Sequence, residues 1–119
     1  AGTQTYTTQV GRFIRSGNLV NTWAHIILSA TDAATAGNVG VGGLPYTASN
    51  ISSLDFICTI AHFGAITLDT GRTQLHARVG SNTAVATLVE SGSNAGGDLV
   101  GVTQLGALTI QIGCNYRIN

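Results

Sequence analysis

The sequence has very little charge and no lysine at all. Only 8% of its 119 residues are charged, against about 25% in typical soluble proteins. Five arginines balance five acidic residues, so the formal net charge is zero. Nucleic-acid binding needs a patch of cations that neutralises several phosphates, and this chain cannot supply one. The composition excludes nucleic acid as a partner. Because low charge removes repulsion between subunits, it also favours an oligomer over a monomer.

Long apolar runs are also absent. No stretch approaches the roughly 20 consecutive apolar residues that a membrane-spanning helix needs. Arg12 and Arg15 are not followed by the apolar core and cleavage site of a signal peptide. We therefore predict no membrane insertion. The chain starts at Ala1 rather than Met, and the sequence leaves open whether it is a processed protein or a piece of a longer one.

Residues that favour helices are scarce, whereas glycine and β-branched residues are common. There is no Met, one Pro and 16 Gly. The clearest pattern runs from Leu108 to Ile118, where apolar residues at even positions alternate with mostly polar ones at odd positions. This period of two indicates a strand with one buried face and one polar face. The polar face holds a single charge, so we expect it to contact another chain. Its candidate interface residues are Thr109, Gln111, Asn115 and Arg117.

Clusters of Gly, Ser, Asn and Asp divide the rest of the chain into short extended segments. Besides 108–118, we expect strands at 6–15, 18–29, 38–44, 54–63, 65–68, 72–79 and 84–90. A loop is expected at 29–37, the most flexible stretch at 91–97, and no assignment is made for 98–106. About eight short strands with frequent turn signals predict an all-β fold. We expect one domain, 1–119, folded as an antiparallel, jelly-roll-like β-sandwich.

The only two cysteines, Cys58 and Cys114, both lie in alternating, strand-like segments. A thiol in such a position behaves as a small apolar side chain. Two cysteines do not make a disulfide framework, so we favour free buried thiols, although the sequence leaves their pairing open. Neither cysteine has an adjacent Lys or Arg that would make it a reactive thiolate.

No motif in the chain identifies a reaction. The three histidines are far apart, with no His-x-His or Cys-x-x-Cys pair to hold a metal. A Gly-x-Ser-x-Gly elbow is absent. Carboxylates are available for glycoside hydrolysis, but three of the five lie at turns, where Asp bonds its own backbone. The glycine-rich run 37–43 lacks the Lys and the helix of a phosphate loop. We predict no enzyme activity, no catalytic residues, no metal and no cofactor.

One polar strand face is mildly unusual because arginine and amide side chains alternate along it. Such groups suit carboxylates and sugar hydroxyls, although a solvated strand face is the more common explanation. Aromatic rings can offer a flat surface for a sugar, but more often they lie in a core or an interface. The candidate ligand-binding residues are Trp23, Tyr46, Arg72, Gln74, His76 and Arg78.

Four short motifs follow one another along nearly the whole chain. They are the opening segment 6–20 (Tyr-Thr-Thr-Gln-Val-Gly-Arg-Phe-Ile-Arg-Ser-Gly-Asn-Leu-Val), Gly-Asn-Val at 37–39 leading into Gly-Leu-Pro-Tyr-Thr at 43–47, Thr-Gln-Leu at 73–75, and the terminal strand 108–118. Together they resemble a domain often found at the C-terminal end of bacteriophage tail fibres and tailspikes. The chain departs from that pattern in the aromatic residues Phe13 and Tyr46, and the segment 54–63 aligns poorly.

The resemblance implies a β-sandwich that assembles as a homotrimer at the end of a virion fibre. There it closes the trimer or binds host cell-surface polysaccharide, beside other virion proteins. It implies a protein made in the bacterial cytoplasm and located in the virion, and it carries over no catalytic residue. The chain is then the C-terminal part of a longer fibre protein or a minimal version of the domain. The alternative hypothesis is a structural capsid-decoration or head-fibre protein.

Overall fold

The computed structural model describes residues 4–31, 37–93 and 95–119. Their regular secondary structure consists of strands and one short 3-10 turn, and no helix among them is long and apolar enough to cross a membrane. The predicted all-β class is therefore confirmed. The elements are β1 (Thr5–Ser16), β2 (Leu19–Ala30), β3 (Gly40–Val41), β4 (Phe56–Ile66), β5 (Gln74–Val79), β6 (Ala86–Gly92), β7 (Ala95–Leu99), a 3-10 turn η1 (Val102–Gln104) and β8 (Leu105–Arg117).

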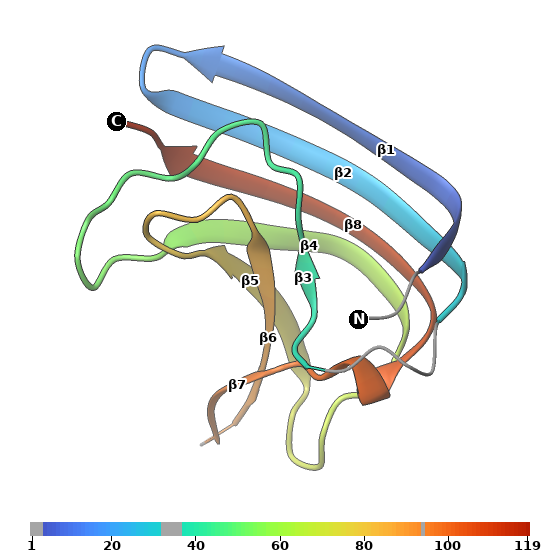
Figure 1. The fold of residues 1–119 in the computed structure, drawn as a ribbon. Coiled ribbons are helices and arrows are strands. Elements are labelled where there is room, and N and C mark those ends of the chain that lie inside the picture. The colour runs from blue at the N-terminus through green and yellow to red at the C-terminus, as the bar shows by residue number, and fades with distance from the viewer. Residues whose placement is uncertain (1–3, 32–36, 94) are drawn as a thin grey trace.

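The eight strands form one antiparallel sheet that curls into a half-barrel (Figure 1). Their order is β1-β2-β8-β4-β5-β6-β3. β7 also pairs with β6, along the same edge of β6 as β3. The long strands β1, β2, β8 and β4 run side by side, while β5, β6 and β3 curve across the concave side. The predicted antiparallel β-sandwich is compatible with this arrangement, in which a single sheet supplies both layers.

Alternation along β8 builds the centre of the core. Every even-numbered residue from Leu108 to Ile118 is buried, whereas the odd-numbered ones are partly or fully exposed. β2 and β6 contribute Val20, Leu28 and Leu88 to the same cluster. The sequence interpretation of the terminal strand is therefore confirmed, and its apolar face packs where the two layers meet.

Two of the predicted segments differ from the structure. β4 continues to Ile66, so the prediction of a separate strand at 65–68 is wrong. Irregular register between Ile60 and His62 and again between Gly64 and Ile66 lets this long strand bend without ending. The strand expected at 38–44 is reduced to Gly40–Val41. Residues 32–36 of the loop predicted at 29–37, and residue 94 in the stretch predicted to be most flexible, lie outside the described residues.

Cys58 and Cys114 form a disulfide, so the prediction of free thiols is wrong. The two residues are directly paired partners on the neighbouring strands β4 and β8, and both side chains are buried. Alternation correctly placed both cysteines on core-facing positions. It could not reveal that β4 and β8 are neighbours, because that pairing joins segments 56 residues apart and depends on the topology of the sheet.

Candidate functional site

The convex side of the long strands carries most of the residues that the sequence identified. We call it the outer face and define it by cross-strand neighbours that point away from the core. These are Val10, Arg12 and Ile14 of β1, Asn21, Trp23 and His25 of β2, Thr109, Gln111, Gly113, Asn115 and Arg117 of β8, and Thr59 of β4. All four predicted interface residues therefore lie on one surface together with Trp23.

The outer face is hollowed beside Trp23. In one cross-strand row, Trp23 and Thr59 lie on either side of Gly113, which has no side chain to fill the space between them. The resulting hollow has a volume of about 450 Å³ and is also lined by Arg12, His25 and Gln111. The Trp23 side chain is 48% exposed. We call this the Trp23 hollow; it combines a flat ring with hydrogen-bond donors.

β1 forms a free edge of the sheet. It pairs only with β2 in the described part of the chain, and all but one of its residues are exposed. Four of the exposed side chains are large and hydrophobic, namely Tyr6, Val10, Phe13 and Ile14. A long apolar edge strand offers unpaired backbone groups and apolar surface to another chain. The free edge of β1 is thus continuous with the outer face.

Tyr46 lies on the other side of β1 from Trp23, and its ring is already in contact with protein. The Phe13 ring packs edge-on against it at 5.7 Å between centroids, and the Arg15 guanidinium lies 5.0 Å from its centroid. The Tyr46 backbone N–H donates a 3.3 Å hydrogen bond to the Tyr116 hydroxyl oxygen. Burial raises the pKa of the Tyr116 phenol above its usual value. We call these four residues the Tyr46 clasp, because they fasten the segment after β3 to β1 and β8.

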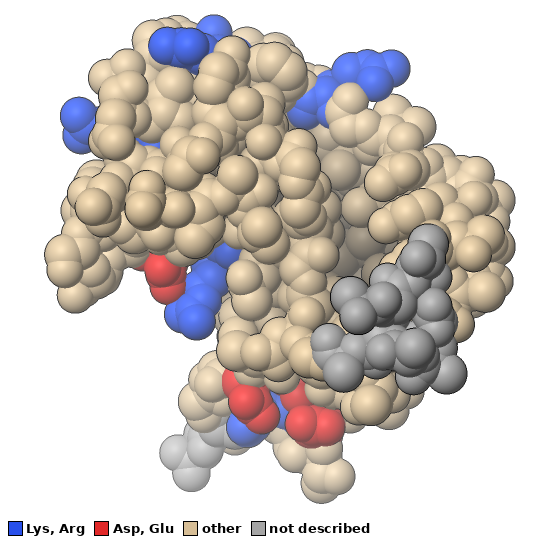
Figure 2. Space-filling model, in the orientation of Figure 1, with Lys and Arg blue, Asp and Glu red and all other residues tan. Residues whose placement is uncertain are grey.

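Beside the Tyr46 clasp, the concave side of the half-barrel is open. An apolar cleft of about 360 Å³ runs between β1 and β2 on one side and residues 41–45 on the other. Gly11, Ala24 and Leu44 are among its lining residues. Figure 2 shows the hollow between these parts of the chain.

Three of the four polar residues predicted on one strand face remain together. Gln74, His76 and Arg78 point away from the side on which Ala77 and Val79 are buried. Arg78 donates a 2.9 Å hydrogen bond to the Asp55 carboxylate, so this arginine already has an acidic partner. Arg72 departs from the group, because its Nη2 lies 4.0 Å from the Asp98 carboxylate.

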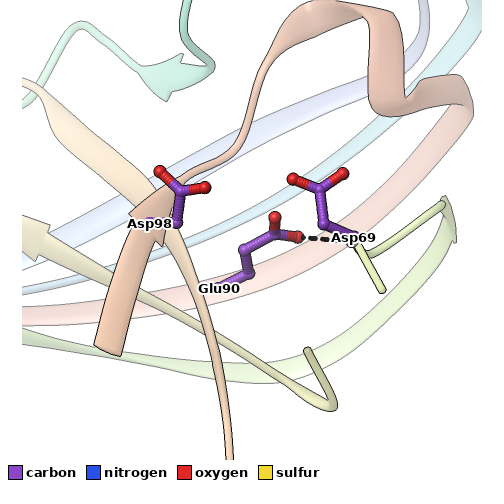
Figure 3. Close-up of side chains that lie close together, drawn as sticks. All are labelled: Asp69, Glu90 and Asp98. Carbon is purple, nitrogen blue, oxygen red and sulfur yellow. Dashed lines mark hydrogen bonds between the residues drawn. The ribbon is translucent and has the colours of Figure 1, made fainter. Parts of the chain in front are cut away.

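Three carboxylates meet at a place that the sequence reasoning did not identify. Asp69 in the turn after β4, Glu90 in β6 and Asp98 in β7 have oxygen atoms within 4.8 Å of one another (Figure 3). We call them the acidic cluster. The signal in the sequence was Glu90, a charged residue at a position that alternation with Ala86 and Leu88 assigns to the core. The three histidines belong to no such cluster among the described residues.

Basic groups are spread more widely than acidic ones over the described surface (Figure 2). In Figure 2 the acidic side chains lie in the lower half of the view and most of the basic ones at the top. Within the described residues, Arg12, Arg15 and Arg117 form no salt bridge, whereas Arg72 and Arg78 each lie near an aspartate. The cations of β1 and of the end of β8 are thus not balanced locally.

Comparisons with known proteins support the fold but no closer relationship. No protein-family model and no curated protein matches the chain. Among solved structures, the crystal structure of Dettilon tailspike protein (gp208) matches with a TM-score of 0.77 and 19% sequence identity. The match covers 100% of this chain and 22% of that chain. An identity this low shows a shared fold alone. The resemblance that the four sequence motifs predicted is therefore supported structurally: this chain has the fold of a part of a tailspike protein.

Proposed function

We propose that the chain is a non-enzymatic module of a phage tailspike or tail fibre, and that it assembles as a homotrimer through the outer face and the free edge of β1. The observation that carries this proposal is the match of the entire chain to part of a tailspike protein. The four motifs of the sequence point independently to the same class of virion protein. The chain spans 22% of the matched tailspike, so the remaining functions of such a protein lie elsewhere.

The surface of the long strands supports self-association. Val10, Ile14 and Trp23 are large, apolar and exposed on it, and β1 leaves backbone hydrogen-bonding groups unpaired at the edge of the sheet. Exposing such a strand to water favours pairing with another chain. The outer face also carries no acidic residue among its defining residues, and its β8 positions are mostly uncharged. Apart from Arg12 and Arg117, its defining residues carry no formal charge, so a second copy can cover the rest of this face without burying a charge.

Light scattering after size exclusion tests the assembly. We expect a molar mass three times the 12.2 kDa of one chain at micromolar concentration. A mass of one chain under these conditions contradicts the trimer. Incubation with host polysaccharide should release no new reducing ends, and release of such ends contradicts the non-enzymatic assignment.

A second candidate function is attachment to host glycan, and the Trp23 hollow favours it. Trp23 provides a ring on which a sugar can stack, and His25 and Gln111 provide polar groups beside it. Arg12 lines the same hollow and forms no salt bridge within the described residues; its Nη1 donates a 2.8 Å hydrogen bond to the Gly11 carbonyl oxygen, and its other N–H groups suit a carboxylate. The ligand that fits this chemistry is an acidic surface polysaccharide.

The variant Trp23→Ala separates the two uses of this surface. If Trp23 binds glycan, the variant remains an oligomer but loses binding to acidic members of a bacterial glycan array. If Trp23 is a subunit contact, the variant dissociates. Leu54→Ala is the matched control, because Leu54 is apolar and 44% exposed but lies outside the outer face, and we expect this variant to retain glycan binding. An array without any bound glycan contradicts attachment and leaves the trimer-forming role.

Antibody labelling of intact virions distinguishes the proposal from a capsid-decoration protein. A tailspike module is expected to label only the tail end of the particle. Label over the capsid surface contradicts the tail assignment and favours the decoration role.

A further inference from the structure

The Glu90 carboxylate is buried at a position where a charge is costly. Its side chain is 0% exposed and lies on the side of β6 that also buries Ala86 and Leu88. Oε2 accepts hydrogen bonds from the Asp69 backbone N–H at 3.2 Å and from Gln104 Nε2 at 2.9 Å. Oε1 is buried and has no hydrogen-bond partner among the described residues. A buried charged oxygen without a partner destabilises a fold unless something else binds it.

The unpartnered oxygen points into the space between two more carboxylates. In Figure 3 the Glu90 side chain lies between Asp69 and Asp98, and the oxygen without a dashed line faces the gap between them. Asp69 and Asp98 are both exposed, whereas Glu90 lies beneath them and is buried. Arg72 is the nearby cation, but its Nη2 lies 4.0 Å from Asp98 Oδ2, which is too far for a hydrogen bond. Three carboxylates and one arginine leave an excess of negative charge here.

We propose that Asp69, Glu90 and Asp98 bind a calcium ion. Carboxylate oxygens bind hard cations such as calcium or magnesium in preference to soft metals. Two ligands of one calcium ion, each about 2.3–2.6 Å from it, lie at most about 5 Å apart, whereas two ligands of magnesium lie at most about 4.2 Å apart. The oxygen atoms of the acidic cluster lie within 4.8 Å of one another, which is inside this limit for calcium, and calcium tolerates irregular ligand geometry better than magnesium does.

The ion would join three segments that the sheet holds only partly. Glu90 is directly paired with Asp98 across β6 and β7, while Asp69 belongs to a turn that closes with a hydrogen bond from Arg72 N–H to Asp69 O. Calcium bound between them connects this turn to the short edge strand β7. Its binding energy would stabilise this end of the sheet, because the unfolded chain does not bring the three carboxylates together.

Thermal unfolding of the 119-residue protein after treatment with a chelator tests the site. A dissociation constant of about 0.1–1 mM, typical of extracellular calcium modules, predicts that about 10 mM CaCl2 raises the unfolding midpoint by roughly 5–10 °C. At the same ionic strength, MgCl2 should raise it much less. Isothermal titration with CaCl2 should give one site per chain. If CaCl2 gives no binding heat and no shift of the unfolding midpoint, the site is absent and the proposal is overturned. Equal midpoint shifts with CaCl2 and MgCl2 would show general charge screening, and this result also overturns the proposal.

Charge-changing variants with opposite expected effects sharpen the test. Asp69→Asn and Asp98→Asn change exposed residues, so the fold should tolerate them, and each should weaken calcium binding at least tenfold. Glu90→Gln should abolish the calcium-dependent shift of the midpoint. Arg72→Gln should tighten binding several-fold, because it removes the cation that competes for Asp98.

Asp55→Asn is the matched control, because it removes one exposed carboxylate outside the acidic cluster. It should leave the calcium-dependent shift unchanged. A shift that is the same in the wild type, Asp69→Asn and Asp98→Asn overturns the proposal even if calcium stabilises the protein.

Discussion

The strands β1 and β8 lie on opposite sides of β2 and pair with it along most of their length. Both are long, and both contain large apolar residues. β8 has a second neighbour in β4 and a layer packed over its inner side, so its even-numbered residues from Leu108 onward are buried. β1 has no second neighbour in the described sheet, and its apolar residues remain exposed. Position in the sheet therefore decides whether an apolar strand stabilises the core or offers a surface.

The Cys58–Cys114 disulfide joins β8 to β4, and we expect its removal to be among the most destabilising changes. It closes a loop across 56 residues, so replacing both cysteines with alanine should lower the free energy of unfolding by about 4 kcal/mol. Urea denaturation of the wild type with and without a thiol reductant should show a loss of the same size. The reductant should leave the double variant unchanged. A wild type whose stability is insensitive to reductant contradicts this prediction.

Isoleucines on the two strands should respond differently to truncation. Ile110 on β8 is 0% exposed, so Ile110→Ala should lower the free energy of unfolding by about 2–5 kcal/mol at any protein concentration. Ile14 on β1 is 59% exposed, and Ile14→Ala should cost less than about 1 kcal/mol in the monomer. If copies cover Ile14, a further loss appears that depends on protein concentration. If both variants lose the same free energy of unfolding at every protein concentration, the proposed difference between a buried β8 and an exposed β1 is contradicted.

The Tyr46 clasp joins β1 and β8. Of these changes, loss of the Tyr116 hydroxyl from this clasp should have the smallest effect on stability. Because burial raises the pKa of Tyr116, the folded protein retains this proton at a pH where the unfolded chain releases it. The stabilisation is complete below the unfolded pKa of about 10 and is lost as the pH rises through the folded pKa. The chain has no lysine to titrate in the same range.

Urea denaturation between about pH 8 and pH 11 measures this contribution. Tyr116→Phe should remove the fall in stability that begins near the unfolded pKa, and it should cost about 1 kcal/mol at neutral pH, since the Tyr46 N–H loses its acceptor. Tyr6→Phe is the control, because Tyr6 is exposed. A fall of the same size in the wild type and in Tyr116→Phe would assign the pH dependence to other groups.

The sequence predicted what depends on local pattern and missed what depends on which segments become neighbours. Alternation identified β8 and its buried face, and the lone charge on the opposite face pointed to the outer face. The disulfide, the row of Trp23 and Thr59 across Gly113, and the acidic cluster all need the order of strands in the sheet. Ala65 has a positive φ of 58°, so the break predicted beside it is a local irregularity within β4. Glu90, a charge in an apolar pattern, is the one sequence feature that could have indicated the acidic cluster.

The molar mass of Ile14→Lys beside that of the wild type tests the central claim most directly. A lysine on the free edge of β1 should prevent another chain from covering that edge, while the exposed position lets the subunit fold. Leu54→Lys is the matched control, because Leu54 is 44% exposed but precedes β4 and lies outside the outer face. We predict a trimer for the wild type and Leu54→Lys, and folded chains of 12.2 kDa for Ile14→Lys. A wild type that is already monomeric, or an Ile14→Lys variant that remains a trimer, would contradict the account.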